Sequence, residues 1–404
     1  MTLGDEQRRE QLPRDSWPAP GAERARISKV TAYATFGGVR NWIFVRVDTD
    51  TGLYGWGEAS TEQWDSTVMD AIRSMGSRLI GQDPIATEHN WQRLSRHAFW
   101  RGGPILQTAL SGLDQALWDI RGKAFGVPVY RLLGGPTRDW VKTYRHVGIY
   151  QPDALVEEAK AYVDQGIRTL KTGAWVQDSS LTETHRLERV VRRLEDLRGA
   201  VGEHVDILVD NHGQSTPDEA IRLIMAIAGV RPLWIEEPIA PEGPELLRHV
   251  STEARRRGIS VALGERLFSR WETRQVLEEQ LVDILQPDLC HAGGITETMK
   301  IASMADVYRC SIAPHNPGGP VSTAAAAHVA MVIPNFSILE YCPDEPRRSE
   351  VQMRPWRHSG DKLFVPEVCG LGVELDVDAI TNVPTQDIAV PTLAFREDGS
   401  VADV

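Results

Sequence analysis

The hydrophobic pattern divides the chain into two regions with different rhythms. Between Ile27 and Glu58, three runs alternate apolar and polar residues, and a Thr-Asp-Thr-Gly turn at residues 49–52 separates the second run from the third. This pattern predicts an antiparallel meander of three strands. Residues 108–125 then place apolar side chains at helical spacing and stop before a Gly-Val-Pro sequence, which predicts a helix. One α+β domain is therefore expected from residue 27 to about residue 150.

From residue 151 onward the pattern alternates between helix and strand. Strands are predicted at residues 169–171, 207–210, 233–236, 261–265, 282–286, 311–314 and 337–340, and amphipathic helices at residues 153–165, 181–197, 218–228, 271–279 and 297–308. Such alternation over about 190 residues is typical of a parallel sheet with crossover helices. A flat doubly wound sheet would collect its ligands at one switch point. Polar residues recur here at nearly every strand end, so a barrel is favoured.

The two ends of the chain differ from both regions. Residues 1–26 are charged and contain proline, which predicts a disordered leader. From about Lys362 the chain returns to short strand-like pieces, and these are expected to fold back on the first domain. The predicted order is a leader (1–26), an α+β capping domain (27–150), a barrel (151–361) and a C-terminal segment on the cap (362–404).

Three successive predicted strands of the barrel end in an acid. Asp210, Glu236 and Glu265 are 26 and 29 residues apart, and one βα unit takes roughly 30 residues in a barrel of eight. The three carboxylates are therefore expected to converge at the carboxyl ends of neighbouring strands. Carboxylates that meet repel each other unless a cation lies between them, and oxygen ligands favour Mg²⁺. The spacing thus predicts a magnesium site.

The series of strand-end polar residues extends in both directions. Asp288, His315 and Glu340 follow at intervals of 23, 27 and 25 residues, and Lys171 closes the strand before Asp210. Catalytic residues of a parallel barrel come from several strand ends that share one mouth. The recurrence, rather than any single residue, predicts an active site there.

Composition narrows the class of partner. The net charge is −12 without a long basic run, which argues against nucleic acid. No 18 consecutive residues are apolar, so no membrane span is predicted. The four cysteines are widely spaced, which suggests neither a zinc site nor a disulfide framework and favours a reduced, cytoplasmic location. An acidic substrate is still compatible with this charge, because a bound divalent ion reverses its sign locally.

Several motifs carry a resemblance to a known family. They are Gly55-Trp-Gly-Glu58, Arg101-Gly-Gly-Pro-Ile105, Leu113-Asp-Gln-Ala-Leu-Trp-Asp-Ile120, Ile235-Glu-Glu-Pro238, Gly264-Glu-Arg-Leu-Phe-Ser-Arg270 and His291-Ala-Gly-Gly-Ile295. From about Ile27 to its end, the chain resembles the enolase superfamily in its mandelate racemase-like subgroup, and most of all the acid-sugar dehydratases of the D-galactonate dehydratase type. The resemblance implies a modified (β/α)₇β barrel with an α+β cap.

The resemblance also assigns roles at the barrel mouth. It implies that Asp210, Glu236 and Glu265 hold Mg²⁺, in agreement with the spacing. The ion would stabilise the enediolate formed when a proton leaves the carbon beside a carboxylate. His315 is the expected base, and Asp288 would fix its tautomer. Glu340, if protonated, would donate a hydrogen bond to the developing oxyanion.

The remaining site residues concern the leaving group and the substrate. His212 is expected to protonate a departing 3-hydroxyl, and the reverse assignment, His212 as base and His315 as acid, stays open. Lys171 is assigned to substrate binding. The segments 36–42 and 58–64 should close over the distal end of the substrate, with Trp42, Trp64 and Arg101 as candidate contacts.

Two departures from the family pattern bear on the reaction. Racemases of the superfamily end the second barrel strand in Lys-x-Lys and use the second lysine as a base, whereas this chain reads Lys171-Thr172-Gly173. The missing base argues against two-base racemisation and fits dehydration. Galactonate dehydratases have Asn at the position of Gly173 and Arg at that of Gln214, which leaves the particular sugar undetermined.

The predicted function is a Mg²⁺-dependent dehydratase of a sugar acid, such as an aldonate, that forms a 2-keto-3-deoxy acid. Two alternatives remain: an isomerase or cycloisomerase of an acid sugar or lactone, and a catalytically degenerate homologue with a binding role. The expected partners are a small sugar acid and further copies of the chain in a homo-oligomer.

Overall fold

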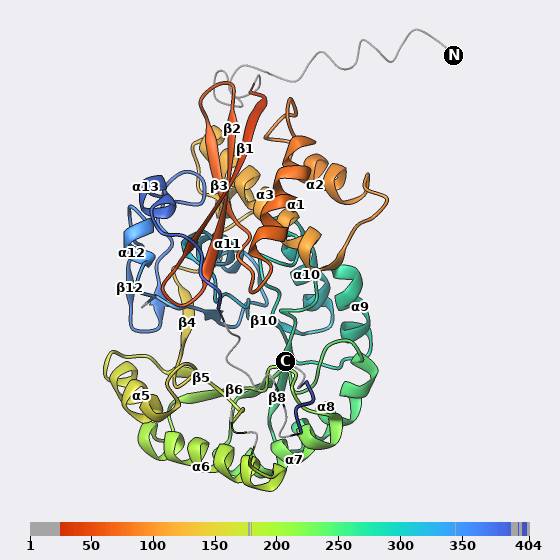
Figure 1. Cartoon of the computed structure of the whole chain (residues 1–404), viewed down its shortest axis with the longest axis vertical. Coiled ribbons are helices and arrows are strands. Elements are labelled where there is room, and N and C mark those ends of the chain that lie inside the picture. Colours follow the sequence, from red (N-terminus) through yellow and green to blue (C-terminus); the bar gives the residue numbers. More distant parts are fainter. Residues whose placement is uncertain are drawn as a thin grey trace.

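The structure is a computed structural model that describes residues 25–176, 178, 180–343, 345–388, 395 and 398–401. Figure 1 shows a capping domain above a larger barrel. The predicted leader lies almost entirely outside the described residues, as does most of the chain after Ile388. Within the described part, no helix is long and apolar enough to cross a membrane.

Three antiparallel strands form the sheet of the cap: β1 (Ile27–Phe36), β2 (Asn41–Thr49) and β3 (Tyr54–Glu58). The helices of the cap are α1 (Asp65–Ser77), α2 (Thr87–Ser95) and α3 (Gly103–Phe125). Helices α1 and α3 pack on the sheet, and α2 packs on α3. Helix α3 ends at Gly126, whose φ of 66° is left-handed. The predicted meander and helix are confirmed.

Glycines on β3 allow the sheet to approach α3 closely. A Cβ atom at Gly55 would lie 2.1 Å from the carbonyl oxygen of Ala116, and one at Gly57 would lie 1.9 Å from that of Gly112. These distances are far below van der Waals contact, so any larger residue would force the helix away from the strand. Packing therefore explains the glycines of the Gly-Trp-Gly-Glu sequence.

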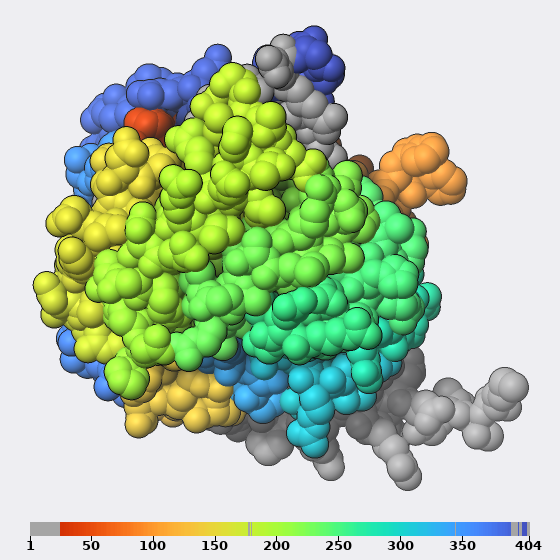
Figure 2. Space-filling view, turned by 90° about the horizontal axis from the view of Figure 1, so that it is seen from below, coloured from red at the N-terminus to blue at the C-terminus, as the bar shows by residue number. Residues whose placement is uncertain are grey.

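The barrel alternates strands and helices from β4 to β11. Its elements are β4 (Val141–His146), α5 (Leu155–Asp164), β5 (Thr169–Gly173), α6 (Glu183–Val201), β6 (Asp206–Asp210), α7 (Pro217–Ile227), β7 (Trp234–Glu236), α8 (Leu247–Arg256), β8 (Ser260–Leu263), α9 (Arg270–Glu278), β9 (Ile284–Leu285), α10 (Gly294–Val307), β10 (Ser311–Ile312), α11 (Pro320–Ala330) and β11 (Leu339–Glu340). Figure 2 shows that the part of the chain coloured yellow through green to cyan, which contains these barrel elements, covers one outer face.

Strand pairing runs around the barrel. Strands β4 to β10 pair in order and in parallel. Strand β11 pairs with β4, and Phe336, shortly before β11, forms a parallel bridge with Ile312 of β10. This is the predicted (β/α)₇β architecture, with one correction: β4 lies within residues 27–150, which the sequence analysis gave to the cap, but its pairing makes it the first barrel strand.

A layer of inward-facing side chains fills the barrel below the strand ends. It contains Tyr144, Leu208, Trp234, Ala262, Ile284, Ala313 and Ile338. These residues come from seven of the eight strands or their immediate ends, and bulky apolar side chains of this kind fill the interior of a parallel barrel. The layer forms an apolar floor on which the polar strand-end residues stand.

The predicted return to the cap from about Lys362 is confirmed for the later part of this segment, whereas its first strand adds to the barrel. Helix α12 (Arg348–Val351) precedes the hairpin of β12 (His358–Ser359) and β13 (Lys362–Leu363), which adds to β4 in antiparallel fashion. Helix α13 (Val377–Thr381) then packs on β1. The Asn41 side chain exchanges two hydrogen bonds with the backbone of Gln386, at 2.8 and 3.0 Å. The C-terminal segment therefore completes the capping domain.

Buried polar residues of α3 and β3 join the cap to the barrel. Asp114 accepts hydrogen bonds from the backbone N–H and the hydroxyl of Thr296 near the start of α10, at 2.9 and 2.6 Å. Glu58 accepts backbone N–H groups of Gly319, Val321 and Ser322 at the start of α11. Carboxylates at helix N-termini satisfy the free N–H groups and complement the helix dipole. Carboxylates of the capping domain thus bind the N-termini of two barrel helices, α10 and α11.

His328 fixes α11 through a hydrogen-bonded, buried imidazole. Its Nδ1 accepts the backbone N–H of Tyr130 at 3.0 Å, and its Nε2 donates to the carbonyl of Leu371 at 3.2 Å. Burial lowers the pKa of His328 to about 4. The neutral form is therefore the one that the fold stabilises.

Protonation of His328 should weaken the fold in mild acid. Because the folded pKa of about 4 lies below the ordinary 6.5, the stabilisation is complete above pH 6.5 and is lost as the pH falls toward 4. We expect a loss of about 2 kcal/mol at about pH 5 relative to pH 7. Urea unfolding of wild type and His328→Gln at both pH values measures this. An equal pH dependence in both proteins would contradict the assignment.

Candidate active site

A buried lysine lies at the centre of the strand-end residues. The Nζ atom of Lys171, on β5, lies 2.7 Å from Glu236 Oε1, 3.1 Å from Glu340 Oε1 and 3.3 Å from Asp210 Oδ2. The residue is 2% exposed. Lys171 was predicted to bind substrate, whereas in the structure its ammonium group forms ion pairs with three carboxylates. It supplies the positive charge that lets these acids be buried together.

Strand register explains why two of the predicted metal ligands are neighbours. Gly173 of β5 pairs with Asp210 of β6, and Asp210 pairs with Glu236 of β7. Glu265 follows β8 after Gly264. The adjacent Glu237 instead forms a bidentate ion pair with Arg266, at 2.7 and 3.1 Å. Glu236, as expected from the alternation of side chains along the chain, is the acid that belongs to the row.

The three carboxylates carry more negative charge than their surroundings compensate. Burial, with the charges of Asp210 and Glu236, raises the pKa of Glu265 to about 7 against the opposing charge of His315. Burial also raises the pKa of Glu236, although Lys171 opposes it. Among the described residues, no three His, Cys, Asp or Glu side chains are arranged so that they could hold a metal ion. As a donor set of oxygen atoms with excess charge, however, Asp210, Glu236 and Glu265 fit a hard divalent cation.

His315 and Asp288 form the predicted pair. Nδ1 of His315 lies 2.7 Å from Asp288 Oδ2, and Nε2 lies 3.3 Å from Glu265 Oε2. Asp288 is itself held by the backbone N–H of Cys290 at 2.6 Å. Burial alone would lower the pKa of His315, but Glu265, Glu340 and Asp288 raise it well above its ordinary value. The pair leaves Nε2 as the nitrogen that can exchange a proton with a substrate.

Glu340 does not fit the predicted role of a protonated hydrogen-bond donor. It is fully buried, its oxygens contact His146 and accept the backbone N–H of Asn316, and Lys171 forms an ion pair with it. Burial would raise its pKa, but Lys171, His315 and His146 hold that pKa well below the ordinary value. Glu340 is therefore an ionised acceptor that orients its neighbours, and the predicted role of a protonated donor was wrong.

His146 is a site residue that sequence reasoning missed. It ends β4, pairs in register with Lys171, and its Nε2 contacts Glu340 Oε1. Burial lowers its pKa, but Cys342 and Glu340 reverse this and raise the pKa to about 9. His146 lies one βα unit before Lys171, and this spacing could have indicated a strand-end residue. The strand Val141–His146 is rich in polar residues, so its apolar pattern is too weak to predict it.

His212 lies at the other end of the carboxylate row from His315. Its backbone has a left-handed φ of 54°, and its N–H donates to Asp210 Oδ1 at 2.9 Å. Its ring lies 5.6 Å from that of Trp175, and its buried Nδ1 has no hydrogen-bond partner among the described residues. Its role as an acid stays a prediction.

The predicted distal contacts differ in outcome. Trp42 is fully buried, packed against Phe44 and the glycines at positions 37 and 319, so its predicted contact with substrate was wrong. Its position on the central strand of the cap sheet directs it into the core. Trp64 is 58% exposed at the start of α1. Arg101 is exposed as well, and both stay predictions.

Arg40, on the loop between β1 and β2, reaches the barrel mouth in place of Trp42. Its guanidinium donates to Glu62 Oε1 at 2.8 Å and to the Tyr150 hydroxyl at 2.7 Å, and Nε lies 3.4 Å from Glu345 Oε1. The Glu62 side chain is half exposed, and the charge of Arg40, followed by those of His291 and His315, lowers its pKa. The predicted closing segments 36–42 and 58–64 therefore meet the mouth through Arg40 and Glu62.

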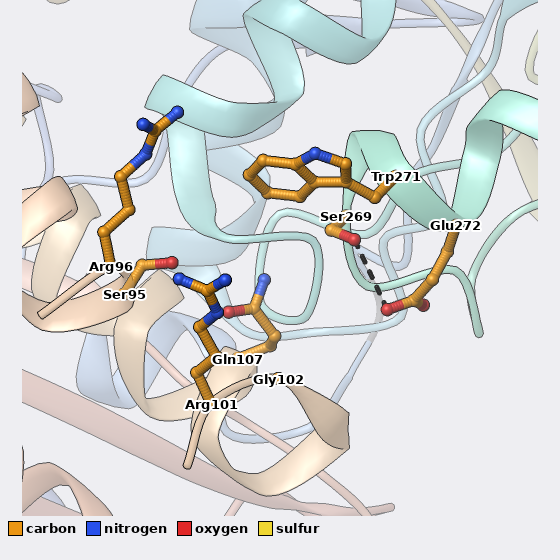
Figure 3. A pocket seen from close by; sticks show the side chains of 8 residues that line it. All are labelled: Ser95, Arg96, Arg101, Gly102, Gln107, Ser269, Trp271 and Glu272. Carbon is orange, nitrogen blue, oxygen red and sulfur yellow. Dashed lines mark hydrogen bonds between the residues drawn. The ribbon is translucent and has the colours of Figure 1, made fainter. Parts of the chain in front are cut away.

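Arg101 lines a separate cavity of about 640 Å³ between the cap and the barrel (Figure 3). The other lining residues are Ser95, Arg96, Gly102, Gln107, Ser269, Trp271 and Glu272. Glu272 bonds to the nearby Ser269 hydroxyl and the backbone N–H of Phe268. The strand-end carboxylates are not among the lining residues, so this cavity is distinct from the metal-ligand row.

Comparison with known proteins identifies the family. Residues 154–379 match the enolase C-terminal domain-like family, and residues 23–134 match the N-terminal domain of mandelate racemase and muconate lactonizing enzyme. The chain belongs to the enolase superfamily, in its mandelate racemase-like subgroup.

Individual relatives extend over most of the chain. D-Galactonate dehydratase of Ralstonia pickettii (strain 12J) is 38% identical over 93% of this chain and 100% of its own length. An enolase from Agrobacterium radiobacter, solved with sodium and L-malate bound, has a TM-score of 0.85 at 30% identity and covers 94% of this chain and 100% of that one. A mandelate racemase/muconate lactonizing enzyme from Jannaschia sp. CCS1 has a TM-score of 0.82 at 32% identity, with coverage of 88% and 97%.

The Lys171 ammonium group should be essential to the stability of the metal-free protein. In EDTA, Lys171→Met should lose about 3–5 kcal/mol, because three buried carboxylates lose their countercharge. Added Mg²⁺ should then stabilise the variant more than wild type, since a cation replaces the lost charge. Thermal unfolding with EDTA and with Mg²⁺ measures both effects. Lys142→Met, at a lysine without an ion pair in the described part, is the control, and an equal loss there would refute this account.

Proposed function

We propose that the protein is a Mg²⁺-dependent dehydratase that removes water from C2 and C3 of a sugar acid, with an aldonate as its substrate and a 2-keto-3-deoxy acid as its product. The observation that carries this proposal is the position of two histidines at opposite ends of the row of three acids. His212 adjoins Asp210, and His315 adjoins Glu265. Elimination needs one base and one acid, and this arrangement offers one of each.

The end of β5 supports elimination over isomerisation. Two-base racemases of the superfamily use a lysine at the end of this strand as the second base, and Gly173 cannot act as one. The enzymes called D-galactonate dehydratase that match almost the whole chain support the same reaction class.

The residues of the chain divide the reaction between them. Asp210, Glu236 and Glu265 would hold Mg²⁺, which when bound supplies positive charge to offset the charge that the substrate carboxylate gains. His315, oriented by Asp288, takes the C2 proton on Nε2. His212 gives a proton to the hydroxyl that leaves C3. Lys171 and His146 hold Glu340 ionised and keep the floor of the site fixed.

The relative from Agrobacterium radiobacter, which is also named as a galactarate dehydratase, was solved with sodium, a hard cation, and with L-malate, a 2-hydroxy acid that carries two carboxylates. In this chain, a hard cation held by the row of carboxylates would take up the carboxylate end of such a hydroxy acid. The same combination of a cation and the carboxylate end of a hydroxy acid is proposed for Asp210, Glu236 and Glu265.

The barrel mouth favours a neutral distal end of the substrate. Arg40 is engaged by Glu62, Glu345 and Tyr150, so two acids and a phenol surround a single guanidinium. A second carboxylate on the substrate would meet this acidic surface and would be repelled. Hydroxyl groups can instead accept from and donate to these side chains. The charges therefore favour aldonates over aldarates.

Replacing His315 should separate catalysis from metal binding. In His315→Asn, dehydration should fall by about 10²–10⁴-fold because the general base is lost, while the Mg²⁺ affinity stays nearly unchanged because the carboxylates remain. Keto-acid formation and titration calorimetry give the two measurements. His97→Asn, at an exposed histidine outside the site, is the control. Near-normal turnover in His315→Asn would refute the assignment of the base.

The substrate class can be tested with a panel of aldonic and aldaric acids. Wild type should favour aldonates by about tenfold or more in kcat/KM, which corresponds to about 1.4 kcal/mol of repulsion. Glu62→Gln should narrow this preference, whereas Glu245→Gln, at an exposed acid on the outer surface, should not. Keto-acid detection across the panel decides. A preference for aldarates that Glu62→Gln leaves unchanged would contradict the charge argument.

A further inference from the structure

A neighbouring side chain, rather than an unusual backbone conformation, explains why position 173 is occupied by glycine. It lies in the regular part of β5, paired with Asp210, and its φ is not left-handed. A Cβ atom built on it would lie 2.4–2.6 Å from three ring atoms of Trp175. Such distances are well inside van der Waals contact, and an indole ring cannot yield as a flexible chain end does. The Trp175 ring therefore occupies the volume that a side chain at position 173 would need.

The turn after β5 holds Trp175 in this place. The backbone N–H of Ala174 donates to the carbonyl of Asp210 at 2.7 Å, and Arg193 of α6 donates to the carbonyl of Gly173. The half-buried Trp175 ring then lies 5.6 Å from the His212 ring at an interplanar angle of 50°. This separation is typical of paired aromatic rings, which restrict one another's rotamers.

We propose that Trp175 is a positioning residue that excludes any proton-transferring side chain from position 173 and holds the His212 imidazole toward the leaving hydroxyl. This proposal rests on the proposed dehydration. Its basis is independent of the metal ligands: a steric exclusion at Gly173 and a ring contact at His212.

The proposal divides the reaction into two separable halves. The C2 proton passes to Nε2 of His315, and the electron pair of the C2–H bond moves into the substrate carboxylate to give an enediolate. That electron pair then forms the C2–C3 double bond as the C3–O bond breaks. The departing hydroxyl takes a proton from His212 and leaves as water. If His212 is misplaced, the C3–O bond stays intact and the C2 proton returns. In D₂O the returning proton is replaced by deuterium.

Trp175→Ala should therefore uncouple exchange from elimination. Keto-acid formation should fall about 100-fold, as expected for a misplaced catalytic group, while deuterium enters C2 of the recovered substrate faster than keto acid forms. Trp175→Phe, which keeps an aromatic ring beside His212, should restore most of the elimination. Parallel loss of exchange and elimination, or unchanged elimination, would overturn the proposal, because a purely structural defect lowers both rates together.

A stability cycle tests the steric part without any substrate. Gly173→Ala should destabilise the wild-type protein, whereas the same change in the Trp175→Ala background should cost little. Equal destabilisation in both backgrounds would overturn the exclusion. Failure of the proposed function looks different: wild type would then neither form keto acid nor exchange C2 protons with any sugar acid, whatever the stability cycle shows.

Discussion

The active site depends on one buried ammonium group. Lys171 lies within ion-pairing distance of Asp210, Glu236 and Glu340, and without it these buried carboxylates would lose the one countercharge that all three share. The same charge balance reaches His315 through Glu340 and Glu265. The row of acids is therefore tolerated in the folded chain, yet it retains enough excess negative charge to attract a cation. Stability and function depend on the same balance.

Much of this arrangement could be predicted from spacing alone. The acids at positions 210, 236 and 265 recur at the period of a βα unit, and the strand ends follow from that period. Strand β4 was missed because Lys142 and Arg145 break its apolar pattern, and α11 was missed because its alanine-rich sequence is buried on all sides and has no amphipathic period. Both failures have one cause. A hydrophobic period appears only in an element that is buried on one side and exposed on the other, and neither β4 nor α11 is such an element.

The side-chain details could not be read from the sequence for a different reason. Trp42 and Arg40 lie two residues apart on the same predicted closing segment. Because β2 begins at Asn41, the tryptophan is fixed in the strand and enters the core, while the arginine lies on the loop and reaches the mouth. Similarly, the ionised state of Glu340 depends on His146 and Lys171, which come from two other strands. Such properties arise from three-dimensional neighbours, which sequence spacing locates only approximately.

The Glu58 carboxylate has a consequence for how a ligand gains access. Glu58 is the last residue of β3, and its carboxylate accepts three backbone N–H groups at the start of α11. These hydrogen bonds join the two domains at the N-terminus of a barrel helix. Separating them would expose those N–H groups and strip a buried charge of its donors, a costly step. Rigid hinge opening is thus disfavoured. Entry is left to the short loops that carry Arg40 and Glu62, whose ion pair is partly solvated and cheap to break.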